Sequence, residues 1–291
     1  MMKINRLPAQ TFNTTGMNET DIDYTPGQYR NVDIYEDTIM TFDNPQDTNI
    51  NVWVKEGKEV SVIMDYRSKD TLNISTRINI EKNGKLKLVQ IDSAPCESRL
   101  INRVNARLEE EADFSIIQIL PGRGDVYTGC TTDLAGNRSK CNMDIAYLVK
   151  DGQKTDMNFI SNHYGKETEC NINADGILKD GAFKLFRGTI DFKTGASGSK
   201  GIENEKVLLL GDDVINQTIP LILCTEEDVE GAHGAQIGSL DEDVLFYFAS
   251  RGIDEKTTEK MISFGSFNRL LRQIDNETVR ENTEKILSEV F

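Results

Sequence analysis

The chain has 291 residues, and 48 Asp and Glu against 33 Lys and Arg give it a formal net charge of −15. This length allows one or two domains with a sizeable core. Non-specific nucleic-acid binding depends on clustered Lys and Arg that displace counterions. The acidic composition therefore argues against a nucleic-acid partner.

The first residues contain no apolar run of signal-peptide length, and no stretch of 18 apolar residues occurs in the sequence. We therefore expect a cytoplasmic protein with no membrane partner. An odd number of cysteines without any Cys-x-x-Cys pair favours reduced thiols over a disulfide framework or a closed zinc site. The five cysteines are Cys96, Cys130, Cys141, Cys170 and Cys224.

Residues 1–30 show neither a helical nor a strand period, which predicts an irregular N-terminal lead-in. From about residue 31, short segments that alternate apolar and polar residues follow one another, as strands with one buried face do. Examples are Val60-Ser-Val62-Ile63-Met64, Leu72-Asn-Ile74-Ser-Thr76 and Phe114-Ser-Ile116-Ile117. The stretches Lys82-Asn83-Gly84 and Ala174-Asp175-Gly176 contain the residues that turns favour, so we expect turns there.

The middle of every second segment recurs at nearly constant steps of 26, 28, 29 and 27 residues, through Val62, Leu88, Ile116, Ile145 and Ile172. A period in this range, made of strands without helices, indicates a β-solenoid. An antiparallel sandwich has similar strand spacing and remains an alternative at this point. The solenoid would occupy residues 31–239.

The pattern becomes helical over residues 240–291. Asp241 to Ser250 begins with acidic residues and ends before Gly252, as helices often do. A second helix is predicted from Asp254 to Phe264, with Gly265 as its stop. A third helix is predicted over residues 276–291, which gives a small C-terminal helical domain.

Few residues point to catalysis. The sequence holds two histidines, of which His163 lies in an expected solvated turn and His233 has a structural role by default. The glycines between Gly122 and Gly129 miss both the P-loop and the dinucleotide-binding spacing, so a tight turn is expected there. Adjacent acidic residues indicate a solvated face rather than a hydrolase. These residues do not identify a catalytic arrangement.

The most informative stretch runs from about residue 181 to residue 267. It contains the motifs Phe186-Arg-Gly-Thr-Ile190, Val207-Leu-Leu-Leu-Gly-Asp212, Ile219-Pro-Leu-Ile-Leu223, Glu227-Asp-Val-Glu-Gly-Ala-His233-Gly-Ala235, Gly238-Ser-Leu-Asp241 and Leu245-Phe-Tyr-Phe-Ala-Ser-Arg-Gly252. In this order and spacing, the motifs resemble those of the SufB/SufD family of iron–sulfur cluster assembly scaffolds, and the resemblance covers roughly the last 110 residues.

The resemblance implies a right-handed parallel β-helix followed by a C-terminal helical domain. It also implies a non-enzymatic scaffold that binds no cofactor stably, although a transient iron–sulfur cluster is possible on it. Family members pair through the end of the β-helix, so a SufB-like partner or a homodimer is expected. They dock a SufC-like ABC ATPase chiefly through the C-terminal helices. That docking region corresponds here to Leu245, Phe246, Tyr247, Arg251 and Gly252.

The SufB type carries a cysteine where this chain has Glu205, and a His-Glu pair where it has His233 and Gly234. The chain therefore looks like a short SufD-like member, and the SufD-type histidine corresponds to His233. An imidazole at an intersubunit groove can ligate iron or move protons, and the alternative is a histidine that only packs or hydrogen-bonds there. Cys224, on the neighbouring strand, is expected to be a buried apolar thiol.

Two other functions remain open from the sequence. One is an exported carbohydrate-active or adhesive β-helix protein, which would need an export signal and aromatic platforms, although Trp53 is the only tryptophan. The other is a SufD-like regulatory protein that binds the ATPase without handling iron.

Overall fold

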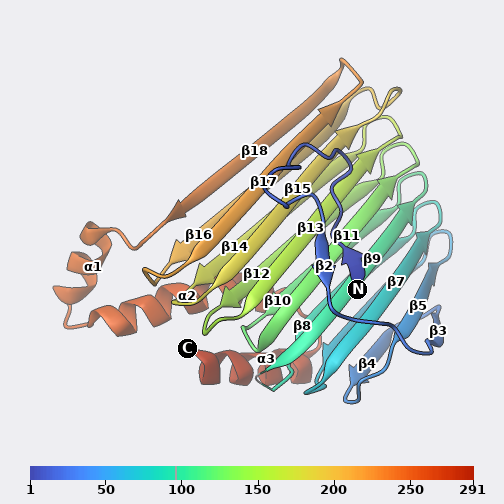
Figure 1. Cartoon of the computed structure of the whole chain (residues 1–291). Helices are drawn as coiled ribbons and strands as arrows, with labels where there is room; N and C mark the ends of the chain where they lie inside the picture. Colours follow the sequence, from blue (N-terminus) through green and yellow to red (C-terminus); the bar gives the residue numbers. More distant parts are fainter. Residues whose placement is uncertain (96) are drawn as a thin grey trace.

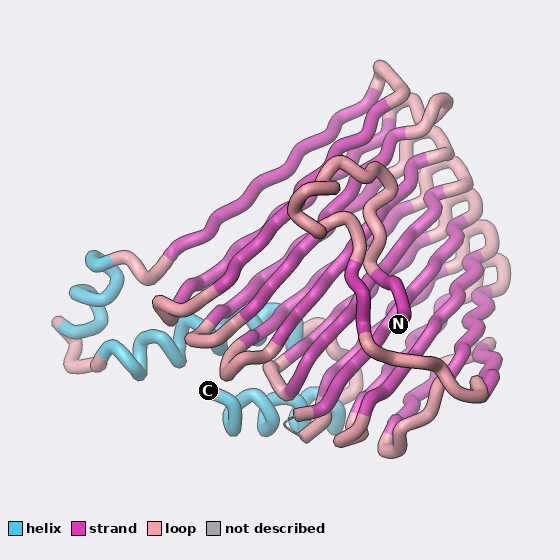
Figure 2. The backbone as a smooth tube through the Cα atoms, viewed as in Figure 1, coloured by secondary structure: helices cyan, strands magenta, loops and turns pink. Residues whose placement is uncertain are grey.

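The computed structural model describes residues 1–95 and 97–291, so Cys96 lies outside the described residues. Sixteen strands form two parallel sheets that face each other, and consecutive strands alternate between them (Figures 1 and 2). The first sheet contains β4 (Thr38–Phe42), β6 (Glu59–Tyr66), β8 (Lys85–Asp92), β10 (Asp113–Leu120), β12 (Lys140–Val149), β14 (Glu169–Leu178), β16 (Ser199–Leu209) and β18 (Val229–Gly238). The second sheet contains β3 (Arg30–Ile34), β5 (Thr48–Val54), β7 (Thr71–Ile80), β9 (Ser98–Leu108), β11 (Gly124–Leu134), β13 (Lys154–His163), β15 (Phe183–Phe192) and β17 (Ile215–Cys224).

The strand register confirms a parallel β-solenoid and excludes the antiparallel sandwich. Val62 pairs with Leu88 and Leu88 pairs with Ile116, which are the predicted steps of 26 and 28 residues. The next partner of Ile116 is Met143, two residues before the predicted Ile145. Both residues point to the same face because side chains alternate along a strand.

The space between the two sheets, which we call the lumen, holds the main core. Its side chains come from every second position of both sheets, as a solenoid requires when each coil buries its apolar face against its neighbours. Members of this core include Ile50, Val62, Ile74, Leu88, Ile116, Met143, Phe159, Ile172 and Phe186.

Three helices follow the last strand: α1 (Glu242–Ala249), α2 (Glu255–Leu271) and α3 (Glu277–Val290). The predicted stop at Gly265 is wrong, because α2 continues through it to Leu271. Phe267, Leu270 and Leu271 are buried against the solenoid, and this packing offsets the cost of about 1 kcal/mol for a glycine inside a helix. The predicted glycine end of α1 is confirmed, since Gly252 adopts a φ of 77°.

Helices α2 and α3 cover the outer face of the first sheet (Figure 1). Outward-pointing Ile63 and Ile117 pack against this helical pair. These strands are thus buried on both faces, which explains why apolar residues stand next to each other in their sequences. None of the helices in the described residues has the length and apolar composition needed to cross a membrane.

Ion pairs fix the helical pair to the strands. The guanidinium of Arg269 on α2 lies 3.0 Å from Asp144 and 2.8 Å from Asp175, which belong to adjacent coils. Lys87 of β8 pairs at 2.6 Å with Asp275, which lies in the loop between α2 and α3. Because Arg269 binds two carboxylates at once, it adds a directional contact to the apolar packing of α2 on the sheet.

Residues 1–29 lie across the outer face of the second sheet (Figure 1). They contain β1 (Met2–Ile4) and β2 (Thr20–Ile22), which pair with each other in antiparallel fashion. Buried Arg187 of β15 donates to the Asp156 carboxylate at 2.7 Å and to the Met17 carbonyl at 2.8 Å. Leu7 packs on Leu185 and Ile219. The segment is therefore tied to coils near the C-terminal end of the solenoid.

The three predicted turns have different outcomes. The tight turn expected between Gly122 and Gly129 is wrong for most of this stretch, because β11 begins at Gly124 and only Gly122, with a φ of 71°, and Arg123 lie in a bend. Lys82-Asn83-Gly84 is confirmed as a turn, in which Asn83 adopts a φ of 56°. The prediction at Ala174-Asp175-Gly176 is wrong, because these residues lie inside β14. Gly176 is required there for packing: a Cβ at this position would come within 2.1 Å of the Tyr147 ring.

Candidate functional site

The solenoid is open at its C-terminal end. Strands β17 and β18 are the last members of their sheets, and no strand of the described residues pairs with their outer edges. The residues of β14 are mostly buried, whereas those of β18 are mostly exposed. The lumen therefore ends in a surface, the lumen mouth, which we define by Lys184, Glu203, Glu205, Thr218 and His233.

His233 lies on β18 in register with Glu203 of β16. Along β16, Gly201, Glu203, Glu205 and Val207 are buried while the residues between them are exposed, so Glu203 points into the lumen. In-register residues of parallel strands project to the same face, which directs His233 over the lumen as well. The predicted site residue thus lies, exposed, at the open end.

A buried ion pair fills one side of the lumen mouth. The Lys184 ammonium donates to the Glu205 carboxylate at 2.5 Å, and both side chains are 0% exposed. Lys184 also donates to the Gln217 carbonyl at 3.2 Å and to the Thr218 hydroxyl at 2.9 Å. Burial lowers the pKa of Lys184, and the charge and hydrogen bond of Glu205 oppose this shift. Glu205 thus serves as the counterion of a buried lysine.

Two hydroxyl groups complete the environment of Glu205. Thr218 donates to one carboxylate oxygen at 2.6 Å, and Tyr147 donates to the other at 2.9 Å. Burial and the negative charge of Glu205 raise the pKa of Tyr147 well above its ordinary value, so it stays a donor. Its three partners, Lys184, Thr218 and Tyr147, hold this carboxylate in one position.

Glu203 has a different environment. It is 2% exposed, and among the described residues its carboxylate forms no hydrogen bond or ion pair. Gly188, on the facing strand, leaves room for it, since a Cβ there would lie 2.8 Å from the Glu203 Cδ. Burial raises the pKa of Glu203 to about 7, and the charge of Glu205 adds to this effect while Lys184 opposes it.

Sequence reasoning did not identify Lys184 or Glu203 as site residues. Charged residues are rarely buried, so a Glu-Asn-Glu stretch reads as solvated. The available signal was the alternation itself, because Glu203 and Glu205 share a face with Gly201 and Val207. Period-two patterning shows that these side chains share a face, although it does not show that the face is internal.

Two expectations about individual residues are wrong. His163 is buried rather than solvated, with its ring nitrogens 2.7 Å from the Thr168 hydroxyl and 3.3 Å from the Ser161 hydroxyl. Burial lowers its pKa to about 4. Cys224 is exposed rather than buried, because it ends β17 at the open coil, and its thiol donates to the Glu226 carbonyl at 2.9 Å.

The described cysteines are all free. Cys130, Cys141 and Cys170 belong to the lumen core, and burial raises the pKa of Cys130 to about 12 and that of Cys141 well above its usual range. The Cys130 and Cys141 thiols are therefore protonated and behave as small apolar side chains. Within the described residues no group of three or more His, Cys, Asp or Glu side chains is arranged to hold a metal ion.

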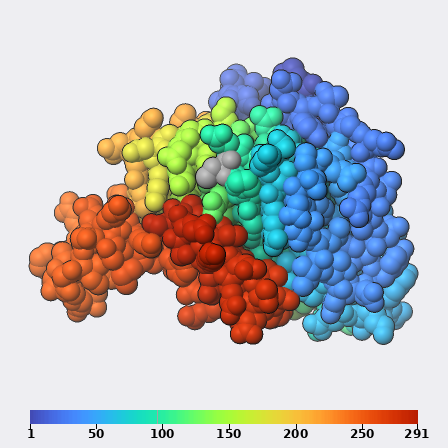
Figure 3. Space-filling model, turned by 90° about the horizontal axis from the view of Figure 1, so that it is seen from below, coloured from blue at the N-terminus to red at the C-terminus, as the bar shows by residue number. Residues whose placement is uncertain are grey.

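The residues predicted to dock an ATPase lie together on α1 and its C-terminal turn. None of the residues of α1 is buried, and the orange segment containing it projects from the body of the molecule (Figure 3). Phe246 is 75% exposed and Tyr247 is 52% exposed. The Arg251 guanidinium lies 3.6 Å from the centre of the Tyr247 ring, and Leu245 is half-buried. This helix therefore presents two exposed aromatic side chains, Phe246 and Tyr247, to solvent.

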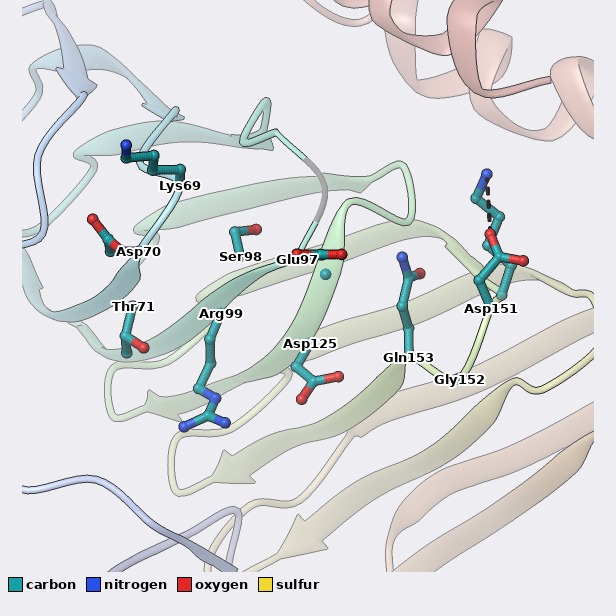
Figure 4. Close-up of a pocket in the computed structure, with 12 residues that line it drawn as sticks. Lys69, Asp70, Thr71, Glu97, Ser98, Arg99, Asp125, Asp151, Gly152 and Gln153 are labelled. Carbon is teal, nitrogen blue, oxygen red and sulfur yellow. Dashed lines mark ion pairs between the residues drawn. The ribbon is translucent and has the colours of Figure 1, made fainter.

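A separate groove of about 640 Å³ lies at the turns between the two sheets (Figure 4). Its lining residues fall between Lys69 and Gln153, so none of them belongs to the lumen mouth. Three cationic and four acidic side chains line the groove, including Arg99, Asp125 and the Lys150–Asp151 pair. Charges of both signs alternate around this open groove. They do not converge on one point, so we assign it no role.

Comparison with known proteins identifies the family. The family model described as "SUF system FeS cluster assembly, SufBD core domain" matches residues 39–266, which is more than half of the chain. The iron–sulfur cluster assembly protein SufD of Bacillus subtilis is 27% identical over 189 residues, covering 64% of this chain and 43% of that protein.

Other relatives give similar matches. An iron–sulfur cluster assembly SufBD family protein of Mycobacterium bovis is 22% identical over 241 residues, covering 80% of this chain and 61% of the relative. Protein ABCI7, chloroplastic, of Arabidopsis thaliana is 23% identical over 239 residues, covering 79% of this chain and 50% of that protein. The chain spans about half the length of these relatives. The chain belongs to the SufBD core family of the SUF iron–sulfur cluster assembly system.

Proposed function

We propose that this protein is a scaffold subunit of a SUF-type iron–sulfur cluster assembly complex, without enzymatic activity of its own. The observation that carries the proposal is the open end of the solenoid, where His233 stands exposed in register with a buried carboxylate. A scaffold needs a surface that joins a partner and also offers ligands to iron, and the lumen mouth combines the two. An assembled cluster would be held transiently and passed on.

The same end is the proposed pairing surface. Strands β17 and β18 present backbone N–H and C=O groups on their outer edges, and such edges pair readily with another chain. A SufB-like partner or a second copy of this chain would extend both sheets. His233 would then lie between the two subunits.

Helix α1 is the proposed docking site for a SufC-like ABC ATPase. Exposed aromatic side chains are frequent anchors of protein interfaces, and Phe246, Tyr247 and Arg251 lie within one and a half turns of each other. ATP-driven movement of the ATPase could be passed through α2 to the first sheet, because Arg269 fixes α2 there.

Copurification tests the docking step. The chain should copurify with the SUF-type ABC ATPase of the same organism, and mass measurement of the complex should give the number of each subunit. Failure to bind any such ATPase would count heavily against the proposal. Replacement His233→Ala should leave folding intact and abolish cluster assembly in cells, whereas unchanged assembly would remove His233 from the site.

A further inference from the structure

The charges inside the lumen mouth do not balance. Lys184 and Glu205 neutralise each other at 2.5 Å, and both oxygens of Glu205 accept hydrogen bonds, from Lys184, Tyr147 and Thr218. Glu203 is the remaining carboxylate, and it has no partner among the described residues. Burying an unpaired carboxylate is costly, and a bound cation or proton would neutralise its charge and lower that cost.

The position of Glu203 indicates which compensation is available. It stands one strand below His233, and in-register positions of parallel strands are about 4.8 Å apart. The Glu203 side chain is confined on the opposite side by Gly188, where even a methyl group would be 2.8 Å from its Cδ. The carboxylate is therefore held inside the lumen, while the imidazole above it is open to solvent.

We propose that Glu203 and His233 are the two donors that this chain contributes to a site for a divalent transition-metal ion at the lumen mouth. This inference rests on the proposed scaffold function, and it adds Glu203 as the buried donor. Carboxylate oxygen and imidazole nitrogen together suit Fe²⁺ and its first-row neighbours. Lys184 has a selecting role: by holding Glu205 it leaves Glu203 as the carboxylate that can reach the metal.

Two protein donors make an open site. Structural metal sites are usually closed by four protein ligands, whereas sites that exchange groups keep positions free. Water or donors of the pairing subunit would fill the remaining positions here. An ion held in this way can be delivered and released, as a scaffold requires.

Cobalt(II) is a suitable probe, because its visible absorption reports the ligands and it tolerates air. The purified full-length chain should bind Co²⁺ at one site, measured by absorption and by isothermal titration. Glu203→Gln keeps the shape of the side chain and removes its charge, and it should weaken Co²⁺ binding by more than about tenfold, the lower end of the loss caused by removing even an indirect partner of a metal. His233→Ala should cause a similar loss.

Two further variants separate position from charge. Gly188→Ala keeps both donors but displaces Glu203, so it should also weaken binding. Glu227→Gln removes an exposed carboxylate next to the same coil, so it should bind Co²⁺ as the unmodified chain does. Circular dichroism and urea unfolding of Glu203→Gln establish that it folds. The inference is overturned if the unmodified chain binds no Co²⁺, or if Glu203→Gln binds it equally well.

ATPase binding distinguishes this inference from the proposed function. Glu203→Gln should still copurify with the ATPase, because α1 lies outside the lumen mouth. Loss of Co²⁺ binding with retained ATPase binding supports the metal site. Unchanged Co²⁺ binding with retained ATPase binding overturns the role of Glu203 and leaves the scaffold proposal standing.

Discussion

The Tyr147 hydroxyl donates to the Glu205 carboxylate at 2.9 Å although the two residues lie two coils apart. Gly176, in the coil between them, makes this contact possible because it has no side chain to block the tyrosine ring. One missing Cβ thus allows a direct hydrogen bond between strands that do not pair.

Replacement Gly176→Ala should therefore destabilise the protein. The added Cβ would lie 2.1 Å from the Tyr147 ring, so the ring must move and its bond to Glu205 is lost. We expect a loss of about 3 kcal/mol in the free energy of unfolding, from overpacking and a broken buried hydrogen bond. Urea unfolding measures it, with Gly238→Ala as the control because no atom lies within 4 Å of that position. Equal stability of the two variants would contradict the packing argument.

Asp92 should make stability depend on pH. Burial raises the pKa of its carboxyl from 3.8 to about 7, while the Ala94 amide and Arg123 oppose the shift. The folded chain therefore keeps a proton that the unfolded chain loses, so the contribution of Asp92 to stability falls as pH rises from about 4 to 7. Replacement Asp92→Asn should stabilise the protein by roughly 2–4 kcal/mol at pH 8 and change little at pH 4. A difference that stays constant over this range would exclude the effect.

His163 should make the stability of the protein depend on pH in the opposite direction, so that stability falls on acidification. Burial holds its pKa at about 4, below the ordinary value of 6.5, so the folded chain keeps the imidazole neutral. The contribution of the neutral imidazole to the free energy of unfolding is fully present above pH 6.5. Up to about 3 kcal/mol of it is lost as the pH falls toward 4. The stability difference between the unmodified chain and His163→Gln should therefore shrink over this range. Urea unfolding at a series of pH values tests it, and a difference that grows on acidification would show that the histidine is protonated when buried.

The exposed aromatic residues of α1 should affect binding and leave stability unchanged. Phe246→Ser and Tyr247→Ser alter side chains that are 75% and 52% exposed, so the melting temperature should stay the same. Copurification with the ATPase should be lost, because aromatic anchors dominate interface energies. Met261→Ser, on α2 and 50% exposed, is the matched control. Retained ATPase binding by both α1 variants would place the docking surface elsewhere.

The architecture was predictable because solenoid strands repeat at a period that the sequence preserves. Val62, Leu88 and Ile116 indicated the coil length without any identity between coils. Helix α2 was predicted too short. The low helix propensity of Gly265 suggested an end there, but the packing of Phe267 on the sheet, which the local sequence does not show, keeps the helix going. Tertiary packing therefore decided the feature that local signals missed.

The site was only partly predictable. The family resemblance led to His233, whereas Lys184 and Glu203 required the structure. Their burial depends on which face of each strand is internal, and charge alone suggests the opposite face. Gly176 was misread for a related reason: a glycine beside an aspartate resembles a turn, although its function here is to make room for Tyr147.

The N-terminal segment has a consequence for how the solenoid unfolds. In a stack of repeats each coil touches only its neighbours, so an end can fray without disturbing the rest. Here β1 and β2 pack on Ile101 and Tyr127, whereas Leu7 packs on Ile219 of the last coil. The segment thereby joins coils that are not adjacent, and loss of the last coil would also expose apolar surface in the middle of the stack. The open end of the solenoid is therefore energetically coupled to the centre of the molecule and should unfold with it as one cooperative unit.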